Sequence, residues 1–230
     1  MNRRLLLVGI TAVAISLVFP HALSAQAPLL VPDKGAFRIL LDGAEVGTET
    51  FETAASGNSW IVRSETVVRV PGAPETRSSG ELRISADGTP LSYKWSAQAE
   101  KKTSGAVEFD QGTAKTSIDL GGKEPHQEDF VFPSPRVAVL DNNLHHQYAL
   151  LALLYNWNVK GQQTLPVLIP QDMTPGSVSL ESLGPKTIEA ARFEALRVNT
   201  ADAEILVYFD PQRRLMRLEV PAANVAVVRR

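Results

Sequence analysis

The chain has 230 residues, of which 44% are hydrophobic and 21% are charged, and its formal net charge at pH 7 is −2. It contains no cysteine, which excludes disulfide bonds, thiolate metal sites, a cysteine nucleophile and a lipid-modified N-terminal cysteine. The weak net charge and the scattered basic residues lack the pattern of nucleic-acid or anionic-lipid binding, so we expect no nucleic-acid partner.

The start of the chain has the pattern of a secretory signal peptide. Two arginines precede an apolar run over residues 5–19, and small residues follow near Ala25 and Ala27. An apolar run of about 15 residues is too short to span a membrane, which takes about 20. We therefore expect residues 1–25 to be a signal peptide, with cleavage after Ala25 or Ala27. The mature protein would be periplasmic or secreted, without an integral membrane segment. Losing the two arginines changes its formal charge from −2 to −4.

From residue 35 to residue 120, hydrophobic and polar residues alternate with a period of two, which is typical of antiparallel strands with one buried face. The clearest alternation runs from Leu91 to Ala99, where Tyr93 and Trp95 share the apolar side. Asp-Gly, Gly-Asn and Gly-Gly pairs separate the segments and predict hairpin turns. Carboxylates on these strands are expected on the polar face, in solvent.

The strongest helical signal after the signal peptide covers residues 141–158. Leu144, Leu151 and Tyr155 share one helical face, and other apolar residues fill much of the remaining circumference, so the helix must be enclosed. Residues 121–140 are rich in proline and charge and exceed the usual loop length. We expect them to cross the mouth of the sheet to the helix, where Asp141 or Asn142 would cap the first free amides.

After the helix the strand pattern resumes. Residues 165–169 predict a short strand at a sheet edge, because Pro166 and Pro170 interrupt it. Further strands are expected over residues 178–183, 187–191, 196–198, 203–209, 215–220 and 225–228. No linker or repeat divides the chain, so residues 33–230 are expected to form a single β-rich domain.

The expected fold is mainly β: a single curved antiparallel sheet, an incomplete barrel, wrapped around one central α-helix. Alternation argues against a parallel sheet covered by helices on both faces, because such strands would be apolar throughout. With one helix available, the sheet itself must enclose that helix.

Three stretches carry a resemblance to a known family. They are F-R-I-L-L-D-G-A-E-V-G-T-E-T-F (Phe37 to Phe51), I-S-A-D-G-T-P-L-S-Y-K-W (Ile84 to Trp95) and Y-F-D-P-Q-R-R-L-M-R-L-E-V-P (Tyr208 to Pro221). They resemble those of uncharacterised exported bacterial β-rich proteins, and the overall plan resembles the lipoprotein-carrier fold. The resemblance implies an envelope protein that binds a lipid or a lipoprotein. The chain differs from the carrier in starting with a strand, and from the lipid-anchored receptor in lacking cysteine.

The first functional hypothesis is a non-enzymatic envelope protein that binds a lipid or another apolar ligand in the concavity of the sheet. Aromatic and apolar residues on the sheet and the helix are the candidate lining: Trp60, Tyr93, Trp95, Tyr148, Leu151, Tyr155 and Trp157. The same residues would equally fill a core. The alternative is therefore a structural or interaction protein with a filled core, whose partner is an envelope protein.

Catalytic motifs are lacking. No Gly-x-Ser-x-Gly elbow and no glycine-rich phosphate loop occurs, and we expect no enzyme and no cofactor. His126, Glu128 and Asp129 form the nearest approach to a metal cluster, to which His145 or His146 could add a ligand. Their spacing matches no metal motif, and adjacent helical histidines point about 100° apart. A metal-dependent hydrolase is the third alternative, and no metal ligand is predicted.

Overall fold

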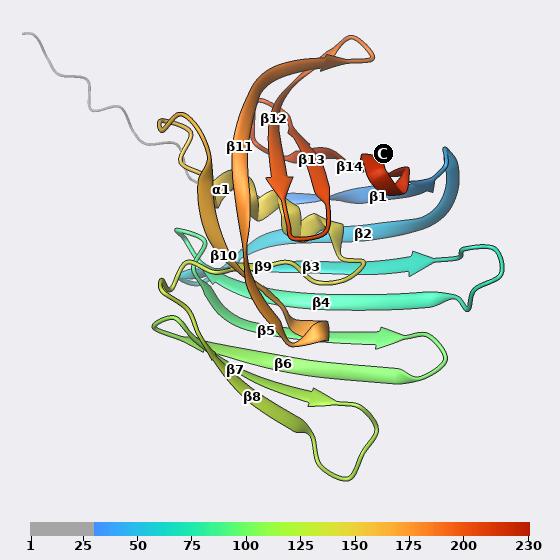
Figure 1. The fold of residues 1–230 in the computed structure, drawn as a ribbon, viewed down its shortest axis with the longest axis vertical. Helices are drawn as coiled ribbons and strands as arrows, with labels where there is room; N and C mark the ends of the chain where they lie inside the picture. Colours follow the sequence, from blue (N-terminus) through green and yellow to red (C-terminus); the bar gives the residue numbers. More distant parts are fainter. Residues whose placement is uncertain (1–29) are drawn as a thin grey trace, which may run out of the picture.

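The computed structural model describes residues 30–230, so the predicted signal peptide and its cleavage site lie outside the described residues. Within that range, fifteen strands join in one sheet in the order β8-β7-β6-β5-β4-β3-β2-β1-β15-β14-β13-β12-β11-β10-β9 (Figure 1). The sheet is mainly antiparallel and stays open, as predicted; the one parallel pair is β9 with β10. The strand bounds are β1 Asp33–Leu41, β2 Ala44–Ser56, β3 Ser59–Val68, β4 Thr76–Ser85, β5 Pro90–Gln98, β6 Lys102–Asp110, β7 Thr113–Asp119, β8 His126–Val131, β9 Ala138–Val139, β10 Gln163–Ile169, β11 Thr174–Ile188, β12 Ala191–Asn199, β13 Glu204–Phe209, β14 Leu215–Val220 and β15 Val225–Arg229.

Strands β1 to β8 form a meander of consecutive hairpins. Buried and more exposed residues alternate along most of β1 to β7, and in β3 the buried Val62, Ser64 and Thr66 alternate with the exposed Arg63 and Glu65. This confirms that the sheet has one buried face and one solvent-exposed face, as the alternation in the sequence predicts.

The prediction for residues 121–140 is partly wrong, because this connection contains β8 at one end of the sheet. Five of the six residues of β8 are exposed and only Phe130 is buried. An exposed edge strand has no buried face to impose a hydrophobic alternation, so the sequence resembles a loop.

The helix is shorter than predicted. A 3₁₀ turn over His145–Leu150 (η1) leads into a single α-helical turn over Leu151–Leu154 (α1), and Figure 1 shows this helical segment enclosed by the curved sheet. Asn143 has a left-handed backbone (φ 59°), which prevents a right-handed helix from starting earlier. Tyr155 is extended (ψ 131°) and ends the helix.

The C-terminal half is a second meander. The strand predicted over 178–183 is part of a longer strand, β11, whose register shifts at a bulge between Ser182 and Gly184. The strand predicted over 187–191 is wrong, because these residues span the end of β11, a two-residue turn and the first residue of β12. β10 lies one strand in from the edge, because the two-residue β9 covers it. Two further 3₁₀ turns span Pro170–Asp172 (η2) and Pro221–Ala223 (η3). β15 pairs with β1 and thereby joins the two halves of the sheet.

The interior contains two hydrophobic clusters. The first joins the strands near the centre and the C-terminal half to the helix: Phe37, Ile39, Phe51, Ala138, Leu140, Leu151, Ala152, Leu154, Tyr155, Leu165, Val167, Val178, Leu180, Leu196, Val198, Ile205, Val207, Phe209, Leu215, Leu218 and Val227. The second lies under β3 to β8: Val62, Leu82, Ile84, Tyr93, Trp95, Val107, Ala114, Ile118, Phe130, Phe132, Val137, Val139, Leu144, Leu150 and Leu168. Helical leucines enter both clusters, so the helix fills the concavity from two sides.

Gly105 in β6 makes room for a buried indole. A Cβ atom on this residue would lie 2.7 Å from Nε1 of Trp95 and 3.0 Å from the backbone oxygen of Ser117. Gly105→Ala is therefore expected to lower the free energy of unfolding by about 1–3 kcal/mol through overpacking. Urea denaturation measures this directly.

Gly176 in β11 provides the matched control, because the nearest atom to its Cβ would be Val167 Cγ1 at an ordinary 3.7 Å. Gly176→Ala should change stability by no more than about 0.5–1 kcal/mol. Equal losses in both variants would contradict the packing explanation.

Candidate functional site

The helix begins against a buried carboxylate on the sheet. Glu49 in β2 is fully buried (0% exposed). Its Oε1 accepts the backbone N–H of His146 (2.9 Å), and its Oε2 accepts the backbone N–H of His145 (2.8 Å). The same Oε2 lies 2.8 Å from Nδ1 of the His145 ring. The prediction that Asp141 or Asn142 caps the helix is therefore wrong. For Glu49, the expectation that carboxylates on the strands lie in solvent is also wrong.

Asp141 instead anchors the chain just before the helix. Its Oδ2 accepts the hydroxyl of Tyr93 (2.7 Å), and its Oδ1 accepts the backbone N–H groups of Asn142 and Gln171 (both 3.0 Å). Its own backbone N–H donates to Oε1 of Gln147 (2.6 Å). Burial raises the pKa of Asp141 to about 6, and these hydrogen bonds offset that burial only in part.

His146 is the buried histidine at the start of the helix. Its Nε2 lies 2.9 Å from Oγ1 of Thr53, and its ring stacks on Phe51 at a centroid distance of 4.0 Å. Its Nδ1 is buried and has no hydrogen-bond partner in the protein. Burial lowers the pKa of His146 to about 4 despite the nearby carboxylates of Glu49 and Asp33, so the imidazole is neutral at pH 7.

A bidentate ion pair between Arg229 and Asp33 lies near this histidine. Arg229 donates from Nη2 to Oδ1 of Asp33 (2.6 Å) and from Nη1 to Oδ2 (2.9 Å), and its guanidinium lies 5.0 Å from the ring centroid of Phe51. Burial alone would raise the pKa of Asp33, but the hydrogen bonds and the charge of Arg229 outweigh burial and hold that pKa below its ordinary value. The pair also ties the first strand to the last.

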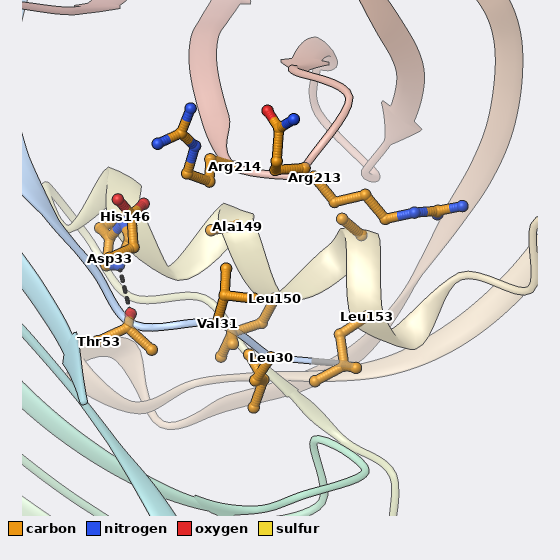
Figure 2. A pocket seen from close by; sticks show the side chains of 12 residues that line it. Leu30, Val31, Asp33, Thr53, His146, Ala149, Leu150, Leu153, Arg213 and Arg214 are labelled. Atoms are coloured by element: carbon orange, nitrogen blue, oxygen red, sulfur yellow. Dashed lines mark hydrogen bonds between the residues drawn. The ribbon is translucent and has the colours of Figure 1, made fainter. Parts of the chain in front are cut away.

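Asp33, Thr53 and His146 line a small cavity between the helix, the start of β1 and the turn between β13 and β14 (Figure 2). Its volume is about 50 Å³. Polar and apolar side chains line it together: Leu30, Val31, Asp33, Thr53, His146, Ala149, Leu150, Ala152, Leu153, Gln212, Arg213 and Arg214. We call it the helix cavity. In Figure 2, Arg214 lies above Asp33 and His146, whereas Arg213 extends along the helix past Leu153.

The two arginines differ in their partners. Arg214 forms an ion pair with Asp210 through Nε and Nη2 (both 2.7 Å to Oδ2), and its Nη1 has no protein partner among residues 30–230. The guanidinium of Arg213 lies 4.2 Å from the ring centroid of Trp157. The polar end of the helix cavity thus holds Arg214, Asp33 and His146.

A second hollow lies on the opposite, convex face of the sheet. It is an open groove of about 450 Å³ over β3, β4 and β5. Its floor is the backbone of Ser64, Gly80 and Trp95, and its rim contains outward-facing residues of both charge signs, including the 2.7 Å pair of Arg63 and Glu81. Because residues of both charge signs line its rim, the groove favours neither an anionic nor a cationic ligand.

The structure distributes the seven predicted pocket residues over the two hydrophobic clusters. The first cluster contains Leu151 and Tyr155 and packs against the half-buried Tyr148 and Trp157; the second contains Tyr93 and Trp95 and packs against the half-buried Trp60. None of the seven lines the helix cavity. Their role in holding an apolar ligand stays a prediction.

The histidines also lie apart. His126 is on the exposed edge strand β8, 4.0 Å from Glu128, whereas His145 and His146 begin the helical segment inside the sheet. Within residues 30–230 no group of three or more His, Asp or Glu side chains is arranged to hold a metal ion. The structure thus does not bring His126 together with the helical pair.

The sequence carried a signal for the missed residue Glu49. Glu49 lies on the same face of β2 as Phe51 and Thr53, so the alternation that buries Phe51 also buries Glu49. A buried carboxylate requires a partner, and the His145–His146 pair supplies the N–H groups. The turn that contributes Arg214 gives no comparable signal, because its position depends on how the second meander folds back.

Fold and site together define an open, barrel-like antiparallel β protein with a short helix enclosed in its concavity. Within residues 30–230 no helix is long and apolar enough to cross a membrane. No family model and no curated protein matches the chain.

The solved structures that are similar to it include the following two. One is a β-barrel-like protein of a domain of unknown function, DUF1849, from Brucella abortus, with a TM-score of 0.56 and 11% identity, covering 87% of this chain and 95% of that one. The other is a DUF1089 family protein from Pseudomonas aeruginosa, with a TM-score of 0.46 and 10% identity, covering 78% and 91%. The first similarity supports the barrel-like fold alone. The finer resemblance to lipoprotein carriers remains an expectation.

Proposed function

We propose that this chain is an exported, non-enzymatic protein of the cell envelope that acts by binding another polypeptide through an exposed edge of its sheet. The observation that carries the proposal is the filled concavity. Pockets for small organic ligands typically measure about 300–1,000 Å³, whereas the cavity beside the helix measures about 50 Å³. A lipid would have to displace the helix or the aromatic residues packed around it.

The open edge of the sheet supplies the binding surface. β8 ends the sheet with solvent-exposed residues, and Val131 at its end is 82% exposed. Such an edge presents backbone N–H and C=O groups that can pair with a strand from another chain. At the opposite end, the two-residue β9 is buried. Only β8 therefore offers a long, accessible edge within residues 30–230.

Charge argues that the partner is a different polypeptide. If two copies of β8 paired antiparallel over their full length, Glu128 of one copy would face Asp129 of the other. Like charges directly opposite each other destabilise a strand pair. A partner strand with lysine or arginine opposite Glu128 and Asp129 would pair favourably, and the charges on β8 would then disfavour indiscriminate association.

The test combines lipid analysis with cross-linking. The protein purified from the cell envelope should release no stoichiometric lipid into an organic extract, as measured by mass spectrometry. Stoichiometric lipid would instead favour the apolar-ligand alternative and the seven predicted pocket residues.

Because the chain lacks cysteine, a single Val131→Cys variant allows site-specific cross-linking. Val159, 49% exposed in the loop after the helix, provides the matched control. We expect a discrete cross-linked heteromeric product with Val131→Cys and none with Val159→Cys. The same products from both sites, or none from either, would contradict the edge as the binding surface.

A further inference from the structure

The helix cavity contains an unusual combination of a buried, unpartnered polar atom and a cation with spare donor capacity. Nδ1 of His146 is buried without a protein partner, although the residue is only 1% exposed. Buried polar atoms are nearly always hydrogen-bonded, and a cavity beside this atom leaves room for a water or another molecule to supply the partner. Nη1 of Arg214, which also lines the cavity, has no protein partner among residues 30–230.

Most charged groups around the cavity are already paired, and the guanidinium of Arg213 lies over the ring of Trp157. Asp33 is neutralised by the two hydrogen bonds from Arg229, and Asp210 by Arg214. His146 is neutral, with Thr53 at its Nε2. If the Thr53 hydroxyl donates to Nε2, the proton of the imidazole resides on Nδ1, which then becomes a hydrogen-bond donor. A donor N–H and a guanidinium N–H that line the same cavity favour an oxyanion.

The remaining walls set the size and shape of the ligand. Ala149, Leu150 and Leu153 of the helix and Leu30 and Val31 before β1 are apolar, and Figure 2 shows the two residues before β1 close to Leu150. One water needs about 10–15 Å³ on the same volume scale, so about 50 Å³ admits a ligand of roughly three to five heavy atoms. A long alkyl chain does not fit unless Leu30 and Val31 move aside.

We propose that the helix cavity is a binding site for a short-chain carboxylate of the size of acetate or propionate. Its carboxylate accepts hydrogen bonds from Nδ1 of His146 and Nη1 of Arg214, and its methyl or ethyl group packs on Leu150. The site is independent of the β8 edge and goes beyond the function proposed above. A ligand this small has few contacts, so the dissociation constant is expected in the millimolar range.

The experiment titrates the whole mature protein, labelled with ¹⁵N, with sodium acetate, propionate and octanoate and follows the imidazole nitrogens by NMR. Acetamide, which has nearly the shape of acetate but no charge, is the matched ligand control. Acetate and propionate should shift Nδ1 of His146 saturably, acetamide should not, and octanoate should bind at least 10-fold more weakly because its chain does not fit. Tight octanoate binding would instead assign the carboxylate to a fatty acid and overturn the size limit.

Two arginine variants separate the proposed contact from a general charge effect. Arg214→Gln should weaken acetate binding at least 10-fold, whereas Arg63→Gln, on the convex face and paired there with Glu81, should leave it within about 2-fold. Loss of binding in both variants, or in neither, would contradict the placement of the carboxylate. The proposal also fails if the NMR spectrum places the imidazole proton on Nε2, because Nδ1 would then be an acceptor.

Discussion

Glu49→Ala is expected to lower the free energy of unfolding by about 3–5 kcal/mol, because it removes the only carboxylate facing the first amides of η1 among the described residues. The N–H groups of His145 and His146 would then be buried without an acceptor. Glu49→Gln should cost less, since an amide oxygen still accepts one of these bonds. Urea denaturation followed by far-UV circular dichroism measures both losses.

The control for this variant lies three residues along the same strand. Glu52 is partly exposed, with 43% of its side chain accessible, and its carboxylate lies 3.7 Å from Lys34. Glu52→Ala should cost no more than about 0.5–1 kcal/mol, because an exposed ion pair contributes little. If Glu49→Ala were as mild as Glu52→Ala, the helix start would not depend on the sheet carboxylate.

The second large effect is a pair of opposing pH dependences. The pKa of His146 falls from 6.5 to about 4 in the folded protein, so the unfolded chain binds more protons between these values and stability decreases as pH falls from 6.5 to 4. The pKa of Asp141 rises from 3.8 to about 6, so the folded protein binds more protons and stability decreases as pH rises from 3.8 to 6. Each shift corresponds to roughly 3 kcal/mol.

In the wild type the two pH dependences of the free energy of unfolding largely cancel, and single variants should reveal each of them. Relative to the wild type, His146→Gln should gain about 3 kcal/mol of stability as pH falls from 6.5 to 4, and Asp141→Asn should gain a similar amount as pH rises from 4 to 6. Urea denaturation across pH 4–7 gives both curves. If the difference in free energy of unfolding between each variant and the wild type were the same at every pH, neither group would titrate with these pKa values.

The alternation of polar and apolar residues determined the class of fold. It defined the N-terminal meander up to β7, because each of those strands has one buried face and one solvated face. The all-round apolar character of residues 144–157 likewise indicated an enclosed helix. Where this contrast is missing, as in the exposed β8, the sequence resembled a connection.

Tertiary structure alone decided the details of the helix and the site. The helix ends at Leu154 rather than Asn158 because side-chain contacts replace the helical bonds: Trp157 donates to the backbone oxygen of Ala152 and Gln163 bonds the backbone of Asn156. The helix cavity joins the start of β1, the helix and the turn at Arg214. Sequence patterns report local periodicity, whereas contacts between such distant segments follow from the way the two meanders close around the helix, through the pairing of β1 with β15.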